Sequence, residues 1–473
     1  MVRSYDRMFV GGEWIRPSGD DTVEVIDAAT ELPLASVARA DAADTDHAVS
    51  AAAAAFEAWS LSDPSRRVLV LRALADELEA RRDEVATMIS EEVGTPIRIA
   101  RRIQAALPVT VLRGYADLLE NRRQNERIGN TLVLREPVGV VAAITPWNYP
   151  LHQIVAKVAP AIAAGCTIVV KPSEVAPRTA FVLAEAAQAA GLPGGVLNIV
   201  PGRGSVVGEA LCSHPDVAAV SFTGSVDAGS RVAALAASAI KRVTLELGGK
   251  SANVVLDDAD LELAVKVGVA NAFLNGGQTC TAWTRLVVPE ARHDEACELA
   301  RGFADAYAPG DPRDPQTRLG PMASADHRET VRDFIRTGQT EGAELIAGGE
   351  EPPDGLDTGY YVRATVFGNV DPDAVIAQEE IFGPVLSIIP HGGDDDALRI
   401  ANNSKYGLHG AVWSADQARA LDVARRMRTG TVDVNGGAYN PLAPFGGYKL
   451  SGVGREMGPY GLDEFVELKA VQV

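Results

Sequence analysis

From residue 138 onward, short apolar segments of this chain alternate with longer stretches that repeat with the period of a helix. The apolar segments contain few polar residues, and they cover residues 138–144, 167–170, 196–200 and 217–222. The helical stretches between them cover roughly residues 152–164, 178–190 and 205–212. Apolar strands without polar alternation, separated by helices, predict a parallel sheet that is covered by helices on both faces.

A second run with the same alternation follows Gly249. Its predicted strands cover residues 252–256, 285–288, 385–389 and 431–434, and a helix is predicted near 326–339. The whole pattern predicts an α/β fold with two doubly wound parallel-sheet domains.

The first third of the chain is predicted to be helical. Residues 64–82 place apolar side chains on one helical face, and Asp63 before Pro64 is a favourable N-cap. Residues 120–135 interrupt this pattern, because they are polar, turn at Asn130 and then alternate like a solvent-facing hairpin. Since an unpaired strand edge needs a partner, this hairpin favours an oligomer.

These changes of pattern divide the chain into three parts. Residues 1–118 and 137–249 are predicted to form one domain, and residues 250–455 the second. Residues 119–136 and 456–473 are predicted to form a small oligomerisation arm and a C-terminal strand.

Composition narrows the function classes. With 47 % hydrophobic and 23 % charged residues among 473, the chain is typical of soluble globular proteins. Its 63 acidic and 44 basic residues give a formal net charge of −19, which would repel phosphate backbones, so nucleic-acid binding is not expected. We find neither an apolar run of membrane-spanning length nor an apolar stretch after the N-terminal charges, so we expect a cytoplasmic protein.

The cysteine pattern excludes the common zinc motifs. Cys166, Cys212, Cys280 and Cys297 form no C-x-x-C pair, and the seven histidines include no H-E-x-x-H. We therefore predict no metal site. Cys166, Cys212 and Cys297 are predicted to pack as small buried hydrophobes.

Three short motifs carry candidate chemistry, through Asn148, Glu246 and Cys280. An amide, a carboxylate and a thiol are the groups that form a covalent adduct, bind its oxyanion and hydrolyse it. Each has a purely structural alternative: Asn148 suits a turn between two prolines, Glu246 could cap the Gly-Gly turn that follows it, and any cysteine can be a buried hydrophobe.

In this order, the three motifs closely resemble those of the aldehyde dehydrogenase superfamily. The resemblance continues through residues 171–174, 222–225, 380–384 and 444–449, and so spans nearly the whole chain. It implies oxidation of a small-molecule aldehyde to a carboxylic acid with NAD, through a thiohemiacetal and a thioester on Cys280. It further implies that Asn148 and the backbone N–H of Cys280 bind the oxyanion, while Glu246 activates water and helps to deprotonate the thiol.

The resemblance also suggests a proton path and an assembly. Lys157 and Glu456 match residues of a proton relay to bulk water, although they could equally form a surface ion pair. The segment at residues 119–136 matches an arm that, with the C-terminal strand, extends the sheet of a neighbouring subunit, so a homodimer or homotetramer is expected.

For the cofactor, two strand-to-helix turns compete. The glycines at 202–208 are spaced G-x-G-x-x-x-G rather than G-x-G-x-x-G, which favours an ordinary tight turn. The turn at 222–229 is the better candidate, because Ser225 can cap the following helix and the exposed helix N-terminus suits phosphates. The resemblance places the pyrophosphate there.

The resemblance assigns the other parts of the dinucleotide as well. Lys171 and Glu174 match residues that hold the adenosine ribose hydroxyls, although alone they could be a solvated charge pair, and Glu380 and Phe382 match those at the nicotinamide ribose and ring. Because the Glu174 carboxylate would crowd a 2′-phosphate, NAD is preferred over NADP. The full set of cofactor candidates is Thr145, Pro146, Trp147, Lys171, Ser173, Glu174, Gly204, Phe222, Gly224, Ser225, Leu247, Gly248, Glu380 and Phe382.

The substrate pocket is predicted at positions that match the family pocket, which are Tyr149, Gln153, Ala156, Thr281, Tyr439 and Phe445. The small Ala156 would leave room for a bulky or elongated aldehyde. None of these positions is Arg or Lys, so a substrate that bears a carboxylate has no obvious anchor.

Two other functions remain open. The first is an acylating dehydrogenase that transfers the thioester to coenzyme A, which the presence of Glu246 disfavours, because such an enzyme needs no water-activating base. The second is a binding or structural protein on the same fold, which the joint presence of Asn148, Glu246 and Cys280 disfavours.

Overall fold

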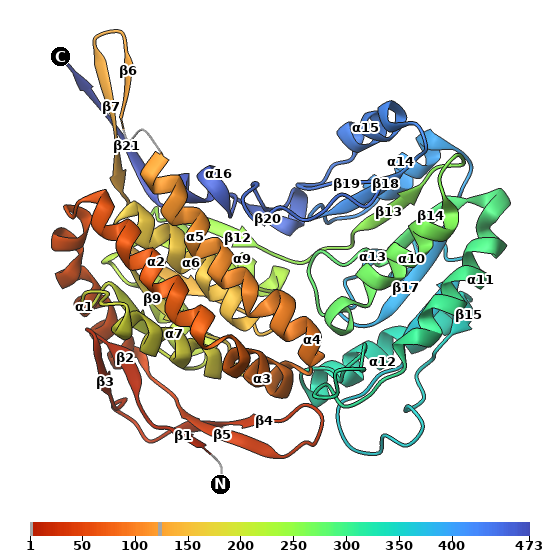
Figure 1. Ribbon diagram of the computed structural model, residues 1–473, viewed down its shortest axis with the longest axis horizontal. Helices are drawn as coiled ribbons and strands as arrows, with labels where there is room; N and C mark the ends of the chain where they lie inside the picture. The colour runs from red at the N-terminus through yellow and green to blue at the C-terminus, as the bar shows by residue number, and fades with distance from the viewer. Residues whose placement is uncertain (1–2, 122–124) are drawn as a thin grey trace.

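The computed structural model describes residues 3–121 and 125–473, and it consists of two lobes and a projecting arm (Figure 1). An eight-stranded sheet forms the centre of the first lobe, in the order β20-β12-β11-β8-β9-β10-β2-β3. Its five central strands are parallel, and β20, β2 and β3 pair antiparallel at the edges. In that order the strands are Gly452–Val453, Arg242–Glu246, Val217–Thr223, Val140–Ile144, Thr167–Lys171, Leu197–Ile199, Met8–Val10 and Glu13–Ile15.

Helices connect the parallel strands of this sheet as the sequence predicts. They are α6 (Pro150–Ala164), α7 (Arg178–Ala189), α8 (Glu209–Ser213) and α9 (Val226–Ala237). The helix predicted at 205–212 is irregular, because Gly204–Gly208 forms a π-helical turn before α8. Residues 150–163 of α6 are all buried, so its polar side chains lie inside the protein.

A seven-stranded sheet forms the centre of the second lobe, in the order β15-β16-β17-β14-β13-β18-β19. All neighbours are parallel except β15. In that order the strands are Glu344–Ala347, Thr365–Gly368, Val385–His391, Arg285–Pro289, Ala252–Val255, Gly410–Trp413 and Asp433–Val434. Its longer helices are α10 (Leu261–Ala272), α11 (His293–Ala304), α12 (Ala325–Thr340), α14 (Asp394–Asn402) and α15 (Gln417–Arg426). The predicted α/β class is therefore confirmed, with sheets that are parallel in the centre and mixed at the edges.

The prediction that the first third is helical is wrong for the N-terminal segment. Strands β1 (Arg3–Tyr5), β4 (Thr22–Ile26) and β5 (Pro33–Ala38) form a separate small sheet, and β2 and β3 join the first large sheet. Several of these strands have three residues and pair with distant strands, so they lack a local periodic signal.

Helices begin only after β5. They include α1 (Ala42–Ser60), α2 (Pro64–Ala80), α3 (Arg82–Val93) and α5 (Ala106–Asn121). The side chain of Asp63 accepts a hydrogen bond from the backbone N–H of Ser65, which confirms the predicted cap of α2.

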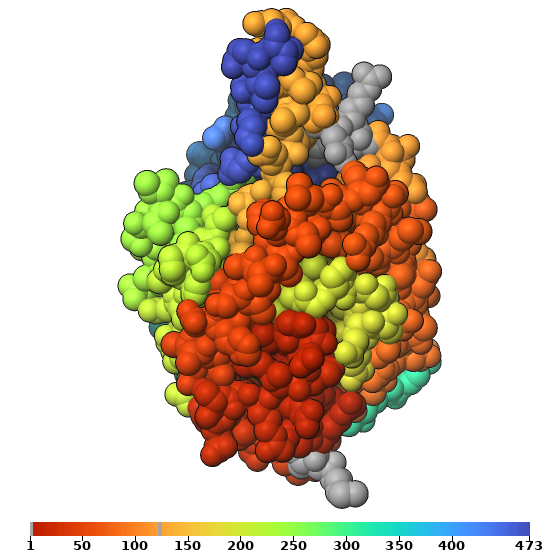
Figure 2. Space-filling view, turned by 90° about the vertical axis from the view of Figure 1, so that its left-hand side faces the viewer, coloured from red at the N-terminus to blue at the C-terminus, as the bar shows by residue number. Residues whose placement is uncertain are grey.

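The arm consists of β6 (Glu126–Ile128), β7 (Thr131–Pro137) and β21 (Val466–Gln472), and it extends away from the body together with the C-terminus (Figures 1 and 2). β7 pairs along its whole length with β21, and both β6 and β21 are edge strands. The predicted hairpin therefore exists, although it begins only after α5; residues 122–124 of the predicted segment lie outside the described residues.

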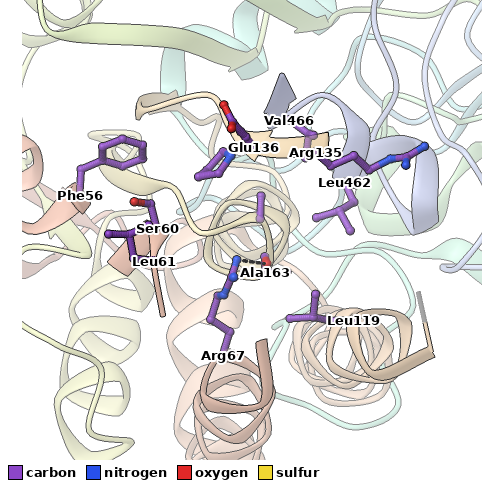
Figure 3. Close-up of a pocket in the computed structure, with 12 residues that line it drawn as sticks. Phe56, Ser60, Leu61, Arg67, Leu119, Arg135, Glu136, Ala163, Leu462 and Val466 are labelled. Carbon is purple, nitrogen blue, oxygen red and sulfur yellow. Dashed lines mark hydrogen bonds between the residues drawn. The ribbon is translucent and has the colours of Figure 1, made fainter. Parts of the chain in front are cut away.

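A cavity of about 360 Å³ lies at the base of the arm, where the arm meets the helices of the first lobe (Figure 3). Leu61 at its rim is 79 % exposed, and the guanidinium of Arg67 donates a hydrogen bond to the carbonyl of Ala163 in its wall. Its lining residues come from α1 and the residue after it, from α2, α5, α6 and α16 (Gly458–Asp463), and from the arm: Phe56, Ser60, Leu61, Arg67, Leu119, Arg135, Glu136, Pro137, Ala163, Ala164, Leu462 and Val466.

Candidate active site

Cys280 lies where two cavities meet between the lobes. One cavity, of about 270 Å³, is lined by Pro146, Trp147, Asn148, Gln153, Thr223, Gly224, Ser225, Glu246, Leu247, Gly248, Cys280, His327, Glu380 and Phe382. The other, of about 330 Å³, also includes Cys280 and Gln153 and has a mainly apolar wall. A thiol at this junction can meet reactants that enter from two sides.

The loop before Cys280 has an unusual backbone. Asn275, Gly276 and Gly277 all have positive φ angles, of 54°, 67° and 73°. A side chain at Gly277 would come within 2.0 Å of the Gly383 carbonyl, and one at Gly249 within 2.6 Å of the Cys280 carbonyl. These glycines therefore permit the close backbone approach that holds the nucleophile loop.

The environment of Cys280 keeps its thiol protonated. Burial raises the pKa of Cys280, and the negative charges of Glu380, Glu246 and Glu456 raise it further. A thiolate is the reactive form, so the proton must be passed to a base as the substrate is attacked.

Glu246 is in a position to be that base. It is the last residue of β12, is 4 % exposed, and its Oε2 atom has no hydrogen-bond partner among the described residues. Burial and the nearby charge of Glu456 raise its pKa well above the usual range. The alternative that Glu246 caps the Gly-Gly turn is wrong, because the N–H of Gly249 donates to Glu380 Oε1 at 2.9 Å.

Asn148 follows β8 and directly faces the nucleophile loop. Its side-chain amide donates one hydrogen bond to the Gln278 carbonyl at 3.1 Å, which leaves its second N–H available. Asn275 donates in turn to the Asn148 carbonyl at 3.1 Å and accepts from the Thr95 hydroxyl. Sequence reasoning missed Asn275 and Thr95, because these residues are distant in sequence and match no motif.

Lys157 and Glu456 form a buried ion pair beneath the site. The Lys157 side chain is fully buried in α6, donates to Glu456 Oε1, and donates to the Thr223 hydroxyl at 2.7 Å. The surface ion pair that the sequence left open is therefore wrong. A buried charge pair of this kind is costly unless its hydrogen bonds are satisfied, and here Thr223 supplies one of them.

The turn between β11 and α9 offers a site for phosphates. The Ser225 hydroxyl accepts from the N–H of Ala228, and Gly224 and Ser225 line the smaller cavity at the N-terminus of α9. The other candidate turn, at residues 202–208, packs against the N-terminal segment. A side chain at Gly202 would meet the Ala40 carbonyl at 3.0 Å. Gly204 nevertheless has open space around it, so it stays a cofactor candidate.

Lys171 and Glu174 do not pair with each other. The Lys171 ammonium donates to the carbonyls of Pro172 and Gly202, at 2.7 and 3.0 Å, and burial lowers its pKa to about 8. Glu174 Oε1 instead accepts from Arg39 at 2.7 Å. The solvated Lys–Glu pair is therefore wrong, and an arginine that the sequence analysis did not consider stands beside the candidate ribose carboxylate.

Glu380 and Phe382 also line the smaller cavity, and they follow α13 (Val375–Gln378) in the chain. Burial raises the pKa of Glu380 to about 7. Phe382 has a φ of 58° and lies 5.6 Å from the Trp147 ring, centroid to centroid, edge to face. His327 contacts both rings, and its Nε2 lies 2.8 Å from the Phe382 carbonyl. Sequence reasoning missed His327, because it belongs to no recognisable motif.

The predicted cofactor residues fit a dinucleotide. A Cβ added to Gly248 would meet Glu380 Oε2 at 2.1 Å, so a larger residue there would displace the Glu380 carboxylate from its position in the cavity. The buried hydroxyl of Thr145 has no hydrogen-bond partner among the described residues. Lys171, Ser173, Glu174 and Gly204 lie beyond the two cavities, around the carboxyl end of β9, and the other candidates border or line the smaller one.

Five of the six predicted substrate-pocket residues line the larger cavity: Tyr149, Gln153, Thr281, Tyr439 and Phe445. Ala156 does not, although it is on the same face of α6 as His152 and Gln153, which do line the cavity. It lies one helical turn further along α6 and is buried in the hydrophobic core. The prediction that its small side chain enlarges the pocket is therefore wrong. The sequence specified the helical face but not how far along the helix the cavity extends.

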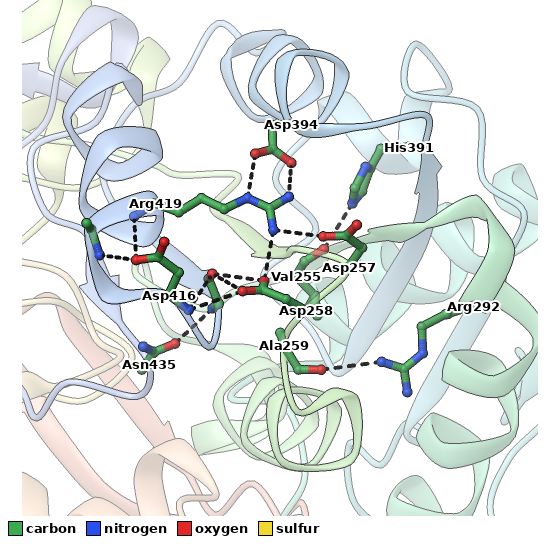
Figure 4. Close-up of polar contacts among 12 residues, drawn as sticks. Val255, Asp257, Asp258, Ala259, Arg292, His391, Asp394, Asp416, Arg419 and Asn435 are labelled. Carbon is green, nitrogen blue, oxygen red and sulfur yellow. Dashed lines mark hydrogen bonds and ion pairs between the residues drawn. The ribbon is translucent and has the colours of Figure 1, made fainter.

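An ion-pair network lies just beyond the carboxyl end of β13, in the second lobe (Figure 4). Arg419 contacts Asp257, Asp258 and Asp394, with N–O distances from 2.5 to 3.1 Å. In residues 3–121 and 125–473, no group of three His, Cys, Asp or Glu residues could hold a metal ion. Each of these carboxylates contacts Arg419, and Asp258 also accepts hydrogen bonds from the Ser414 hydroxyl and the backbone N–H of Asp416, so we assign the network a structural role.

Comparison with known proteins agrees with this geometry. The aldehyde dehydrogenase family model matches residues 14–471. The chain belongs to the aldehyde dehydrogenase family. It is 48 % identical to a 3-succinoylsemialdehyde-pyridine dehydrogenase from Pseudomonas sp., over 99 % of both chains, and 45 % identical to a geranial dehydrogenase from Castellaniella defragrans, over 100 % of this chain and 99 % of the other.

Solved structures of the family superpose closely. A mutant of aldehyde dehydrogenase C from Pseudomonas syringae, complexed with NAD⁺ and octanal, has a TM-score of 0.98 at 46 % identity, covering 99 % of this chain and 96 % of that one. An aldehyde dehydrogenase from Mycobacterium tuberculosis, complexed with NAD⁺, has a TM-score of 0.97 at 42 % identity, covering 100 % and 99 %. The predicted family and enzyme class, an oxidoreductase acting on aldehydes, are confirmed. In the described ranges, no helix has the length and apolar character of a membrane span.

Proposed function

We propose that this aldehyde dehydrogenase oxidises its substrate to a carboxylic acid with NAD, through a covalent adduct on Cys280. The observation that carries this proposal is the position of the thiol at the junction of two cavities, one with a phosphate-binding turn and one with an apolar wall. The test is a panel of aldehydes with NAD, in which the absorbance of the reduced cofactor and the acid product are both measured.

In the first step, the Cys280 sulfur bonds to the aldehyde carbon while Glu246 takes the thiol proton. The carbonyl oxygen becomes an oxyanion, and it accepts hydrogen bonds from the free N–H of Asn148 and the backbone N–H of Cys280. A bound NAD would supply the acceptor for the hydride that leaves the same carbon. Cys280 then carries a thioester.

In the second step, Glu246 has released the thiol proton to solvent and takes a proton from water as the water oxygen bonds to the thioester carbon. The carbon–sulfur bond breaks, the thiolate of Cys280 leaves, and the carboxylic acid is released. We assign Lys157 and Glu456 to this transfer of the proton to solvent, because their buried pair acts directly on Glu246: the charge of Glu456 raises the pKa of Glu246, and the charge of Lys157 lowers it.

The activity should rise with pH across the range in which Glu246 titrates. The pKa of Glu246 is raised, so its carboxyl group is protonated at a higher pH than an ordinary glutamate, and a protonated Glu246 accepts no proton. We expect kcat/KM to increase as pH rises through this pKa, and the corresponding limb to be missing in Glu246→Gln. A wild-type profile that is flat across this range would contradict the role of Glu246 as base.

NAD is assigned as the cofactor because the Glu174 carboxylate lies at the end of β9, and because two superposing family structures were solved with NAD⁺. Arg39 reduces the repulsion that Glu174 exerts on a 2′-phosphate, since it neutralises part of that charge. The selectivity is therefore set by two residues together.

We expect kcat/KM to favour NAD over NADP by at least about tenfold, or roughly 1.4 kcal/mol. Glu174→Ser should narrow this ratio, because it removes the carboxylate and frees the Arg39 guanidinium for a phosphate. As the control, Arg39→Met in the Glu174→Ser background should undo part of the gain. If the wild type prefers NADP, or Glu174→Ser leaves the ratio unchanged, the assignment of Glu174 is wrong.

We further propose that the protein is a cytoplasmic homodimer or homotetramer, assembled through the arm. The open edges of β6 and β21 and the exposed side chains of Ile128 and Leu468 support a second copy as the partner. The four free cysteines are consistent with a reducing compartment. Size-exclusion chromatography with light scattering would give the number of subunits.

A further inference from the structure

Among the polar side chains in the wall of the larger cavity, three form a cluster that the catalytic steps do not use. They are Trp283, His409 and Asp433. Trp283 is 2 % exposed and His409 is 5 % exposed, so both are buried, and the cavity wall around them is mostly apolar. Polar groups placed in such a wall need partners, and they are a usual source of specificity in a ligand pocket.

The order of strands in the second sheet brings these three residues together. Trp283 lies two residues before β14, His409 immediately precedes β18, and Asp433 is the first residue of β19. The four neighbouring strands β14, β13, β18 and β19 are parallel, so their amino ends share one edge of the sheet. The same edge carries the loop of Cys280, which also precedes β14.

The hydrogen-bonding groups of this cluster are not satisfied within the described part of the chain. The indole N–H of Trp283 and both ring nitrogens of His409 are buried and lack hydrogen-bond partners there. His409 Nε2 lies 3.1 Å from Asp433 Oδ2, but the angles do not suit a hydrogen bond. The great majority of buried polar atoms are paired, so the hydrogen-bonding capacity of this cluster is left for a partner from outside the protein.

Neighbouring contacts fix the cluster in place. The backbone N–H of Trp283 donates to the Asn271 side chain at 2.8 Å, and the Trp283 ring meets His409 edge to face, with centroids 6.2 Å apart. The apolar side chains of the same cavity are Ile103, Leu107, Val267, Leu274, Phe445 and Met457. A ligand would therefore have an apolar body against these residues and a polar group at the cluster.

We propose that Trp283, His409 and Asp433 form a subsite for a hydroxyl group on the tail of the aldehyde. The indole N–H can only donate a hydrogen bond and the carboxylate can only accept one, whereas a hydroxyl does both at once. None of the described residues that line this cavity is Lys or Arg, so a carboxylate tail would meet the charge of Asp433 without compensation. The inference rests on the proposed function, because it assigns the larger cavity to the aldehyde.

The test compares unbranched alkanals of increasing length with their ω-hydroxy and ω-carboxy analogues, each with NAD. We expect kcat/KM to favour the ω-hydroxy compound over the plain alkanal at the lengths that reach the cluster, and the ω-carboxy compound to be the poorest. Trp283→Phe keeps the ring but removes the donor, so it should lower the ratio of ω-hydroxy to plain alkanal by about tenfold.

The control is Trp413→Phe, which removes another buried indole donor from the same lobe. Trp413 donates to Asn253 and does not line the cavity, so its substitution should leave the ratio unchanged. As a second variant, Asp433→Asn should raise the relative kcat/KM of the ω-carboxy analogue several-fold.

The inference is overturned if the wild type shows no ω-hydroxy preference at any length, or if neither Trp283→Phe nor Asp433→Asn changes these ratios. Failure to oxidise any aldehyde with NAD would instead contradict the proposed function.

Discussion

Cys280→Ala should abolish aldehyde oxidation and leave NAD binding largely intact. The sulfur is the atom that forms the adduct, and no other cysteine lines either cavity among the described residues. The proposed contacts with the adenosine ribose and the pyrophosphate lie at β9 and at the start of α9, on the other lobe. Turnover with a reactive aldehyde and calorimetric titration with NAD would measure the two properties separately.

Cys297→Ala provides the matched control. Cys297 lies on α11 in the core of the second lobe and is buried away from both cavities, so this variant should retain turnover. Mass spectrometry after mixing the wild type with aldehyde and NAD should find the acyl group on Cys280 alone. Substantial turnover by Cys280→Ala would exclude the covalent mechanism.

Glu246→Gln should slow hydrolysis of the thioester by about 10²–10⁴-fold, the usual contribution of a positioned base. The substitution preserves volume, so the buried site should keep its shape. If the first step still proceeds, mixing enzyme, NAD and aldehyde should give a burst of one reduced cofactor per active site, followed by a slow steady state. Because Glu246 is also assigned to deprotonate Cys280, the rate of the burst should fall as well.

Two further measurements make the result decisive. Glu298→Gln removes a surface carboxylate that is paired with Arg301, and it should turn over like the wild type. Adding coenzyme A separates hydrolysis from acyl transfer. If wild-type turnover depended on coenzyme A and released acyl-coenzyme A, water would not be the acceptor and the acylating alternative would be correct.

The parts of the fold that the sequence predicted well are those with a strong local pattern. The strands β8, β9, β11 and β17 are continuous apolar runs, and α2 has both a helical stripe and an Asp63 cap. The N-terminal strands have neither length nor periodicity, because partners far along the chain stabilise them. A local sequence pattern indicates how nearby residues are arranged, but it does not identify pairing partners far along the chain.

The same division applies to the site. Asn148, Glu246 and Cys280 stand in recognisable motifs, and the structure brings all three around one cavity. The partner of Glu174 could not be predicted, because Arg39 is 135 positions away and belongs to no motif. The Trp283, His409 and Asp433 cluster depends on the order of strands in the sheet, which residue types alone do not specify.

The return of the chain to the first lobe has a consequence for biosynthesis. β20 completes an edge of the first sheet, Glu456 pairs with Lys157, and β21 completes the arm. All three lie in residues 452–473, which are synthesised after the rest of the first lobe. Until they emerge from the ribosome, the ammonium group inside α6 lacks its counter-ion and β7 lacks its longest neighbour. The first lobe therefore cannot mature before residues 452–473 have been made, and a chain that stops short of them should be recognised by cellular quality control as unfinished.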